Sequence, residues 1–292
     1  MAMQSKIDIY NLLPADSIPK TLFISKEAAK NFDVSQIKNY PIVVKPNEGL
    51  KGLGVTFIHS ASELSNYLQN THLDIILQEK ITGNTELGVF YCRYPNQENG
   101  FITGITQKKY MNVIGDGIST VRQLAKQNNR INRQLKSLEK ICVKTLDSIP
   151  EKGKVVEILP IGSHTRGAEF INVTDKYKEA IYPLINNIAS KIEGFYYGRF
   201  DIICNIDEAT QKIIDFKIIE LNGAMSEPIH IYDPKNSLFY AWRQIVKHWE
   251  IMSKIAYLNK DQKMKSVGFL NGLKLIAQNL KLESKLKNEL YG

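Results

Sequence analysis

Hydrophobic and polar positions along the chain follow a helical period in some segments and a strand-like pattern in others. The clearest helix is predicted over residues 174–193, where apolar or small side chains recur at i, i+3, i+4, i+7 and i+8 spacing. A second helix is predicted over 237–258, and a basic amphipathic helix over 128–144. Short apolar strands are expected between them, and no internal repeat is visible. The chain therefore mixes helices with strands.

A glycine-spaced loop lies between two of the predicted strands. Residues 41–46 (PIVVKP) form a short apolar strand, 47–54 (NEGLKGLG) the loop, and 55–58 the return strand. The loop does not open a helix, so it is neither a Walker A loop nor a Rossmann fingerprint. Its glycines reach positive φ freely, which lets backbone N–H groups turn towards a phosphate chain. The alternative interpretation is a plain glycine-rich hairpin.

Polar residues stand at the end of an apolar strand in the stretch 216–233 (FKIIELNGAMSEPIHIYD). Glu220 and Asn222 are two apart, so on a strand their side chains share a face. A carboxylate beside an amide oxygen suits Mg²⁺ better than Zn²⁺. Arg199 and Asp201 repeat the pattern on the strand 196–203 (YYGRFDII). Together the two strands predict a pocket for Mg²⁺ and anionic oxygens; the alternative is two hairpin strands with polar edges.

The composition is that of an ordinary globular protein, with 43% hydrophobic and 23% charged residues. The formal net charge is +8, which could attract nucleic acid, a membrane or acidic substrates. No basic–aromatic interleaving and no zinc-finger spacing accompany it, so no nucleic acid partner is expected. Neither a secretory signal nor an apolar run of about 18 residues is seen, so no membrane span is expected.

The cysteine pattern favours a reducing compartment. The three cysteines are odd in number and far apart, and each lies among apolar or mixed residues: Cys92, Cys142 and Cys204. Buried free thiols are the expected state, which predicts a cytoplasmic protein. No two His or Cys residues have zinc-ligand spacing. His230, between two isoleucines, is interpreted as a structural histidine, and the role of His164 stays open.

Taken in order, these elements resemble the ATP-grasp superfamily, in the branch of D-alanine–D-alanine ligase and cyanophycin synthetase. The resemblance covers roughly residues 20–250. It rests on PIVVKP, NEGLKGLG, LQEKITGNTELGVF (77–90), VIGDGISTVRQL (113–124), GRFD (198–201) and IIELN (218–222). It implies an α+β fold in which two lobes with antiparallel sheets hold ATP between them. The implied activity is an ATP-dependent carboxylate–amine ligase that forms an amide or peptide bond through an acyl phosphate, on an amino acid or peptide.

The same resemblance assigns a nucleotide site. Lys45 would contact ATP phosphate and the adenine edge, and the glycine loop would cover the phosphates as a flap. Glu79 and Ile81 would meet the adenine edge, and Glu86 the ribose hydroxyls. The implied cofactor-binding residues are Lys45, Gly49, Gly52, Gly54, Glu79, Lys80, Ile81, Glu86 and Lys108.

Metal, catalytic and substrate roles also follow from the resemblance. Its implied ligands for two Mg²⁺ ions, or for Mn²⁺ in their place, are Asp201, Glu220 and Asn222. Arg199 would stabilise the transferred phosphoryl group, and Arg166 in 162–175 (GSHTRGAEFINVTD) would be a second anion partner. Ser226 and Glu227 are expected to contact an amino or carboxyl group of the substrate. Their alternative is helix capping and turn hydrogen bonding.

The predicted organisation has four parts: a short N-terminal segment 1–40, a small lobe with the flap 41–85, a large catalytic lobe 86–258 and a Lys-rich helical segment 259–292. Fewer than 40 residues precede the first lobe strand, too few for the separate N-terminal domain of the family. A family lysine ahead of the ATP lobe has only a weak match, at Lys6. A homodimer or a partner chain is one expected way to complete the substrate site. The alternative functions are an ATP-grasp kinase or a nucleotide-binding protein without ligation.

Overall fold

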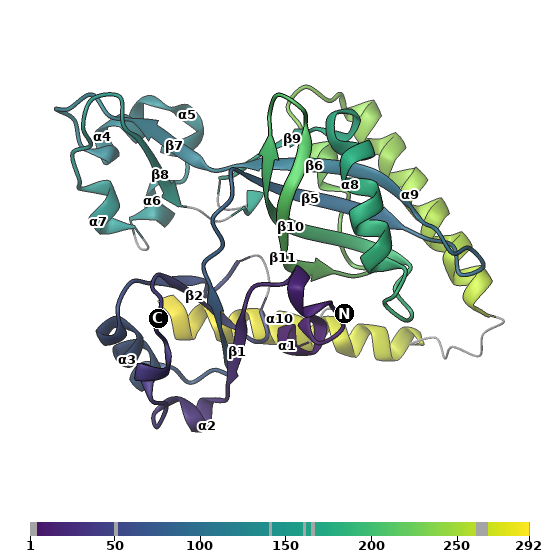
Figure 1. The fold of residues 1–292 in the computed structure, drawn as a ribbon, viewed down its shortest axis with the longest axis horizontal. Helices are drawn as coiled ribbons and strands as arrows, with labels where there is room; N and C mark the ends of the chain where they lie inside the picture. The colour runs from purple at the N-terminus through teal and green to yellow at the C-terminus, as the bar shows by residue number, and fades with distance from the viewer. Residues whose placement is uncertain are drawn as a thin grey trace.

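A computed structural model describes residues 5–49, 52–139, 142–159, 162–164, 167–260 and 268–291. In these residues the chain forms a four-stranded sheet, a five-stranded sheet and a two-stranded ribbon, each with its own helices (Figure 1). Every pairing between these strands is antiparallel. The predicted class, helices combined with antiparallel sheets, is confirmed.

The four-stranded sheet has the order β1-β4-β2-β3. Its strands are β1 Thr21–Ile24, β2 Ile42–Pro46, β3 Thr56–Ile58 and β4 Ile75–Glu79. The helices near it are α2 Lys26–Ala29 and α3 Ala61–Asn70, with a 3₁₀ turn at Val34–Gln36. Helix α1 (Lys6–Tyr10) and the 3₁₀ turn at Ala15–Ser17 lie between the two large sheets, since the Lys6 N–H donates to the Asn47 carbonyl and the turn contacts β11. Helix α3 begins after Ser60, whose hydroxyl accepts from the Glu63 N–H, and it buries Leu64 and Leu68 in the core of this sheet.

The predicted strand–loop–strand is confirmed. Strand β2 pairs antiparallel with β3, with Val43 opposite Phe57. The loop glycines Gly52 and Gly54 have φ of +69° and +74°, in the left-handed region where a residue without Cβ is unstrained. Residues 50 and 51 lie outside the described residues.

The five-stranded sheet has the order β11-β10-β5-β6-β9 and both of its faces are covered. Its strands are β5 Thr85–Cys92, β6 Phe101–Lys109, β9 Glu169–Asn172, β10 Tyr197–Asp207 and β11 Lys212–Asn222. Alternate residues of β5 pack on opposite sides: Val89 joins the core with helix α8 (Thr174–Ala189), and Phe90 joins the cluster with helix α9 (Leu238–Asn259). This is why β5 reads as a continuous apolar run rather than an alternating one.

A third unit holds the ribbon β7 Met111–Ile114 and β8 Val155–Leu159 with four short helices. These are α4 Val121–Gln127, α5 Asn129–Asn132, α6 Leu135–Leu138 and α7 Val143–Leu146. The prediction of one helix over 128–144 is wrong. Asn128 ends α4 and caps α5 through its side chain, and Cys142 has a non-helical ψ of 32°, so the pieces turn around a small core of their own.

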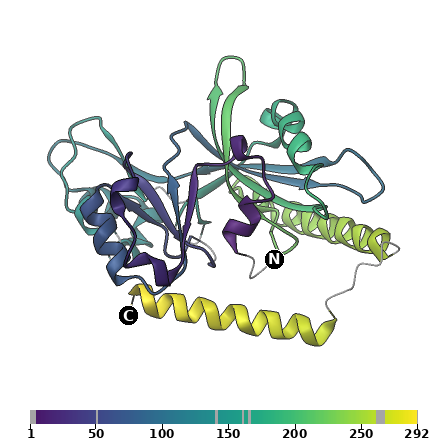
Figure 2. The same ribbon diagram turned by 60° about the horizontal axis from the view of Figure 1, so that its bottom comes forward.

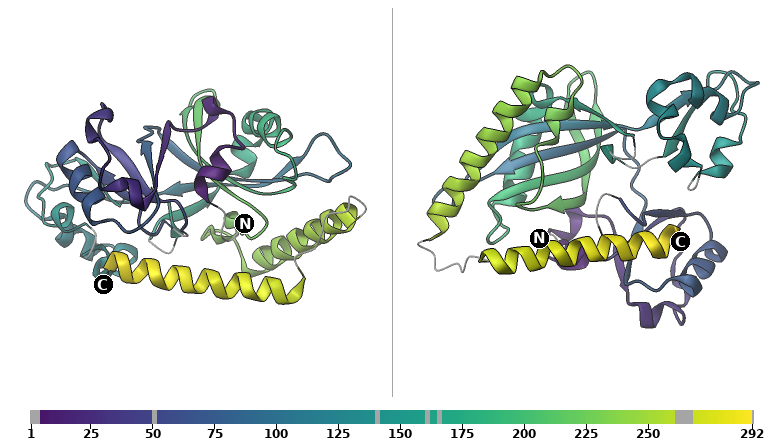
Figure 3. Two further views of the ribbon diagram at one scale, coloured as in Figure 1. Left: turned by 90° about the horizontal axis from the view of Figure 1, so that it is seen from below. Right: turned by 180° about the vertical axis from the view of Figure 1, so that it is seen from behind.

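The C-terminal region is helical, as predicted. Helix α9 begins after Ser237, whose hydroxyl accepts from the Tyr240 N–H, and a 3₁₀ turn at Ile229–Tyr232 precedes it. Helix α10 (Phe269–Tyr291) runs apart from α9, along the side of the molecule where the four-stranded sheet lies (Figures 2 and 3). None of the helices in the described residues is long and apolar enough to cross a membrane. The four-part division of the chain stays a prediction.

The thiols of Cys92 and Cys204 are buried, as expected from their apolar surroundings, but Cys142 is only partly buried, so the expectation is wrong for that residue. Burial raises the pKa of each thiol to about 12, so both are protonated at neutral pH.

Candidate functional site

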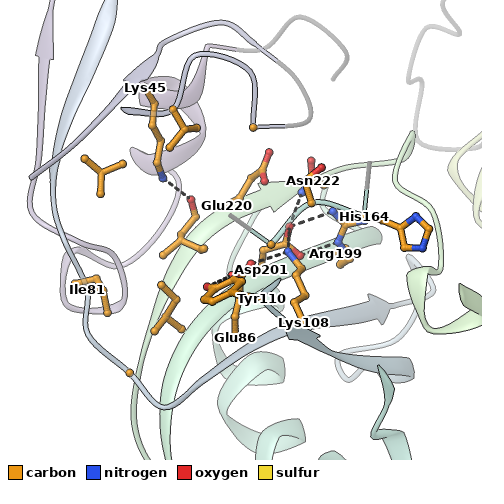
Figure 4. A pocket seen from close by; sticks show the side chains of 18 of the residues that line it. Lys45, Ile81, Glu86, Lys108, Tyr110, His164, Arg199, Asp201, Glu220 and Asn222 are labelled. Atoms are coloured by element: carbon orange, nitrogen blue, oxygen red, sulfur yellow. Dashed lines mark hydrogen bonds and ion pairs between the residues drawn. The ribbon is translucent and has the colours of Figure 1, made fainter. Parts of the chain in front are cut away.

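A cavity of about 1010 Å³ is lined by residues of both large sheets (Figure 4). It brings together most of the side chains singled out from the sequence. These are Lys45, Gly49, Gly52, Glu79, Lys80, Ile81, Glu86, Lys108, Arg199, Asp201, Glu220, Asn222, Ser226 and Glu227. Gly54 is not among the lining residues and is a buried turn residue of the flap. Arg166 lies outside the described residues.

The register of β10 against β11 places the predicted polar pairs face to face. Arg199 lies opposite Asn222, and Asp201 lies opposite Glu220. Within β10 the guanidinium of Arg199 contacts Asp201 through both carboxylate oxygens, with Nε–Oδ1 at 2.7 Å and Nη2–Oδ2 at 3.1 Å. Residues two apart on a strand share a face, so the two-residue spacing in the sequence predicts that these side chains are neighbours.

A buried ion network extends from this pair across the sheet. Lys108 Nζ lies 2.8 Å from Glu86 Oε1 and 3.1 Å from Asp201 Oδ2, and all three side chains are 5% exposed or less. The Tyr110 hydroxyl donates to the second oxygen of Glu86. Burial alone would raise the pKa of Asp201, but Arg199 and then Lys108 outweigh it and hold that pKa at about 2. Asp201 is therefore ionised at neutral pH.

Two half-buried lysines face this network from the other side of the cavity. Lys45 Nζ donates to Gln78 Oε1 at 2.7 Å, and Lys6 Nζ donates to the carbonyls of Pro46 and Gly49 at 2.9 and 3.3 Å. Burial lowers the pKa of Lys45 to about 8, against the attraction of Glu220, and it also lowers the pKa of Lys6. The weak sequence match at Lys6 is thus a cavity residue. A lone lysine ahead of the first strand was the only signal for it.

The segment that joins the two sheets runs along the cavity as well. Ile81 lines it, and Lys80 Nζ lies 5.6 Å from the centre of the Phe57 ring. The Glu79 carboxylate accepts from the Lys20 N–H at 2.9 Å, so it holds the end of β4 to the start of β1. The nucleotide contacts assigned to these residues stay predictions.

The far end of the cavity is aromatic and acidic. Glu227 Oε2 accepts from the Tyr232 hydroxyl at 2.9 Å, and the Tyr232 ring stacks on His164 with centroids 5.2 Å apart. The Ser226 hydroxyl donates to the Gly223 carbonyl at 2.6 Å, which is the turn bond expected under the structural interpretation. Tyr232 was missed because no pattern in the sequence places it beside His164. His230 is buried and outside this lining, as the structural interpretation expects.

The chain is similar in sequence to known ligases, although no protein-family model matches it. It is 29% identical over 259 residues to the glutathione biosynthesis bifunctional protein GshAB of Streptococcus mutans, which covers 80% of this chain and 33% of the relative. It is 22% identical over 218 residues to cyanophycin synthetase of Nostoc sp., covering 68% of this chain and 23% of the relative. The resemblance to the ATP-grasp ligases is confirmed. The chain spans about a third of the length of GshAB.

A solved structure of D-alanine–D-alanine ligase from Bacillus anthracis aligns with 96% of this chain and 68% of its own, at 12% identity and a TM-score of 0.45. The confirmed likeness to ATP-grasp ligases rests on the sequence relatives.

The oxygen donors predicted from the ATP-grasp resemblance fit a hard divalent cation. Asp201 and Glu220 are carboxylates on facing strands, and Asn222 adds an amide group two residues further along β11. The Asn222 amide lies 3.4 Å from Asp201 Oδ2, so the three groups form one patch. Within the described residues no group of three or more His, Cys, Asp or Glu side chains has metal-site geometry, and the donors here are two carboxylates with an amide.

The ion network predicts a large stability cost for losing its centre. Asp201→Ala leaves Arg199 without its bidentate partner and Lys108 with only Glu86, so the free energy of unfolding should fall by about 3–5 kcal/mol. Urea denaturation followed by circular dichroism measures this change. The exposed Asp16→Ala is the matched control and should stay within about 0.5 kcal/mol of the parent. Equal unfolding midpoints for parent and Asp201→Ala would contradict the network.

Proposed function

We propose that the chain is an ATP-dependent carboxylate–amine ligase that forms an amide or peptide bond on an amino acid or peptide. The observation that carries the proposal is the meeting of two sets of side chains in one cavity. Arg199, Asp201, Glu220 and Asn222 come from adjacent strands of one sheet, and Lys45 comes from the other sheet. The sequence relatives support it, since one is named as a glutathione biosynthesis protein and the other as a cyanophycin synthetase.

The nucleotide is proposed to lie with its phosphates between the lysines and the β10–β11 patch. ATP has about four negative charges, so its phosphates favour a site rich in cations. Lys45 and Lys6 supply positive charge from one side and Arg199 from the other. The flap glycines Gly49 and Gly52 line the same cavity, where backbone N–H groups can approach phosphate oxygens.

Glu220, Asn222 and Asp201 are the residues proposed to hold Mg²⁺, or Mn²⁺ in its place. When bound, such ions neutralise charge on the phosphate oxygens. Asp201 already contacts Arg199 and Lys108, so its carboxylate would bind the metal ion while it is also paired with two cationic side chains.

The proposed chemistry has two steps. A substrate carboxylate oxygen attacks the γ-phosphorus of ATP, forming an O–P bond while the bond to the β-phosphate oxygen breaks and ADP leaves. An amine nitrogen then attacks the carbonyl carbon of the acyl phosphate, inorganic phosphate leaves, and the nitrogen loses a proton. Arg199 is proposed to stabilise the charge on the transferred phosphoryl group in both steps. Closure of the 47–54 loop over the cavity would exclude water, which otherwise hydrolyses the acyl phosphate.

The amine is proposed to enter at the aromatic and acidic end of the cavity. Glu227 offers an exposed carboxylate there, held by Tyr232, and its own carbonyl lies 3.4 Å from Arg199 Nη1. An ammonium group beside Glu227 would therefore lie next to the phosphoryl-transfer site. The rings of Tyr232 and His164 form a wall on which a cationic or planar group can pack.

The first test is ADP release with Mg·ATP and a mixed pool of amino acids and dipeptides, coupled to mass-spectrometric detection of an amide product. Glu220→Ala should lower turnover by at least about a hundredfold, because it removes one of two carboxylates from the phosphate site. Asp215→Ala, an exposed carboxylate on the same strand, is the matched control and should leave turnover unchanged.

Other outcomes of that screen would point elsewhere. A stable phosphorylated product without an amide would indicate a kinase. ATP binding without product from any pool would indicate a nucleotide-binding protein that does not ligate. Absence of Mg·ATP binding by calorimetry would remove the proposal altogether.

ATP binding should be coupled to proton uptake near pH 8. Burial lowers the pKa of Lys45 to about 8, so above that pH the free protein holds this lysine mostly neutral. Phosphate charge favours the ammonium form, so ATP binding takes up a proton there and affinity falls as pH rises through 8. Calorimetry at pH 7 and pH 8.5, in buffers of different ionisation enthalpy, measures the uptake. Lys45→Met should reduce it; an identical uptake in that variant would rule out Lys45 as its source.

Glu227→Gln should weaken the amine substrate selectively. The change removes the carboxylate charge but keeps an acceptor for Tyr232, so the KM for the amine should rise about 10- to 100-fold. The KM for ATP should not change, because the phosphate site is left intact. Steady-state kinetics with the amine found by the screen gives both constants. A parallel rise in the KM for ATP would contradict a separate amine subsite.

A further inference from the structure

Helix α9 has an apolar face on the side away from the five-stranded sheet. Its inner face packs on the sheet through His248, Ile251 and Ile255, which are buried. The outer face exposes large side chains: Leu238 73%, Phe239 78%, Trp242 59%, Val246 49%, Trp249 63% and Tyr257 74%. We call this set the α9 stripe. Figure 3 shows α9 along the edge of the molecule, with no other helix over its outer side.

The spacing of the α9 stripe is that of a helix–helix seam. Phe239, Trp242, Val246 and Trp249 follow one another at intervals of three, four and three residues. This alternation keeps side chains on one line of a helix that packs against another helix. A surface helix that faced only water would carry polar residues at these positions.

The area of the α9 stripe is large for a free surface. An aromatic side chain can bury about 150–250 Å². At the exposures above, the four aromatic residues together present roughly 400–700 Å², and Leu238 and Val246 add to this. The largest apolar patch of a monomer is typically about 300–600 Å², and a stable interface buries about 800 Å² on each partner. The stripe is therefore of the size that one side of a protein interface needs.

We propose that the α9 stripe is a dimer interface in which α9 of one copy packs antiparallel on α9 of a second copy about a two-fold axis near Val246. Such an axis places each half of the stripe on the opposite half of its partner. Trp242 and Trp249 flank the axis and lie in the centre of the contact, where aromatic anchors contribute most to binding. The interface is isologous, so the same patch serves both copies.

The charges beside the stripe favour a second copy of this chain as the occupant. Arg243 and Glu250 are both exposed and are seven residues apart, so they lie on the same edge of the stripe. An antiparallel partner about the proposed axis brings Arg243 of one copy opposite the partner's Glu250, and the symmetry makes the pair twice. Lys254 lies over the Tyr94 ring at 4.4 Å, which turns its charge towards the sheet and away from the seam.

Helix α10 supplies the main competing occupant. It exposes Leu270, Leu273, Ile276 and Leu280, and it follows α9 in the chain. In the structure it lies apart from α9 (Figure 3), and Leu286 near its end is buried beside Gly49. The end of α10 therefore packs on the flap side of the molecule. Folding of α10 onto α9 within one chain is thus an outcome that the experiment must separate.

The test uses the full-length chain in sedimentation velocity over a range of concentrations, with tryptophan fluorescence as a second readout. The two tryptophans of the sequence are both in the stripe, so their emission reports the seam directly. We expect a dimer whose emission shifts to the red on dilution. Val246→Glu keeps both tryptophans but buries a carboxylate at the axis, so its dissociation constant should rise by roughly a hundredfold or more.

Charge reversal tests the two-fold geometry. Arg243→Glu alone brings like charges together and should weaken the dimer, while Arg243→Glu with Glu250→Arg should restore it. Ile214→Glu, an exposed apolar position on β11, is the matched control and should leave the dimer intact.

Three outcomes would overturn the proposal. A monomer with blue-shifted emission at all concentrations would show that α10 of the same chain covers the stripe. A monomer with red-shifted emission would leave the stripe without a second copy. A dimer that persists in Val246→Glu, or that the double reversal fails to restore, would place the interface elsewhere.

Discussion

Buried charges on three neighbouring strands fix the arrangement of the whole cavity. Lys108 on β6 lies within salt-bridge distance of both Glu86 on β5 and Asp201 on β10, and all three side chains are almost out of contact with water. Each of them alone would be costly to bury, so they are stable only together. A slip of one residue in any strand would turn its charge to the other face and leave the others unpaired. The pairing of the buried charges therefore fixes the register of the sheet and, with it, which side chains face the cavity.

The same constraint pairs the charges of the network with one another. Arg199 and Lys108 neutralise Asp201 and Glu86, so these charges are largely balanced within the sheet. Lys45 and Lys6 face this sheet from the other lobe, and burial lowers the pKa of both. Glu220 attracts both lysines and offsets part of this effect. A multiply charged anion between the lobes would favour the ammonium form of both lysines, which is the physical argument for the phosphate position proposed above.

Much of this was readable from the sequence because strand geometry is simple. A spacing of two residues put Arg199 with Asp201 and Glu220 with Asn222, and the structure pairs the two sets directly. The glycine loop was placed between two strands because its flanks were apolar and short. Each of these predictions depended on residues close together in one segment, or on a two-residue spacing that occurs in both strands.

The features that the sequence signalled weakly, as at Lys6, or not at all, as at Tyr232, depend on which faces meet after folding. Lys6 reaches the cavity because α1 packs beside β2, and Tyr232 reaches His164 because a 3₁₀ turn returns to the sheet. No local period records either event. Helix α9 is another case in which the sequence alone is insufficient. Its apolar residues occur on both sides, so the sequence does not tell which side packs on the sheet. Once Ile251 is known to face inward, Trp242 and Trp249 must face outward, and an exposed pair of tryptophans demands an explanation that a buried pair would not.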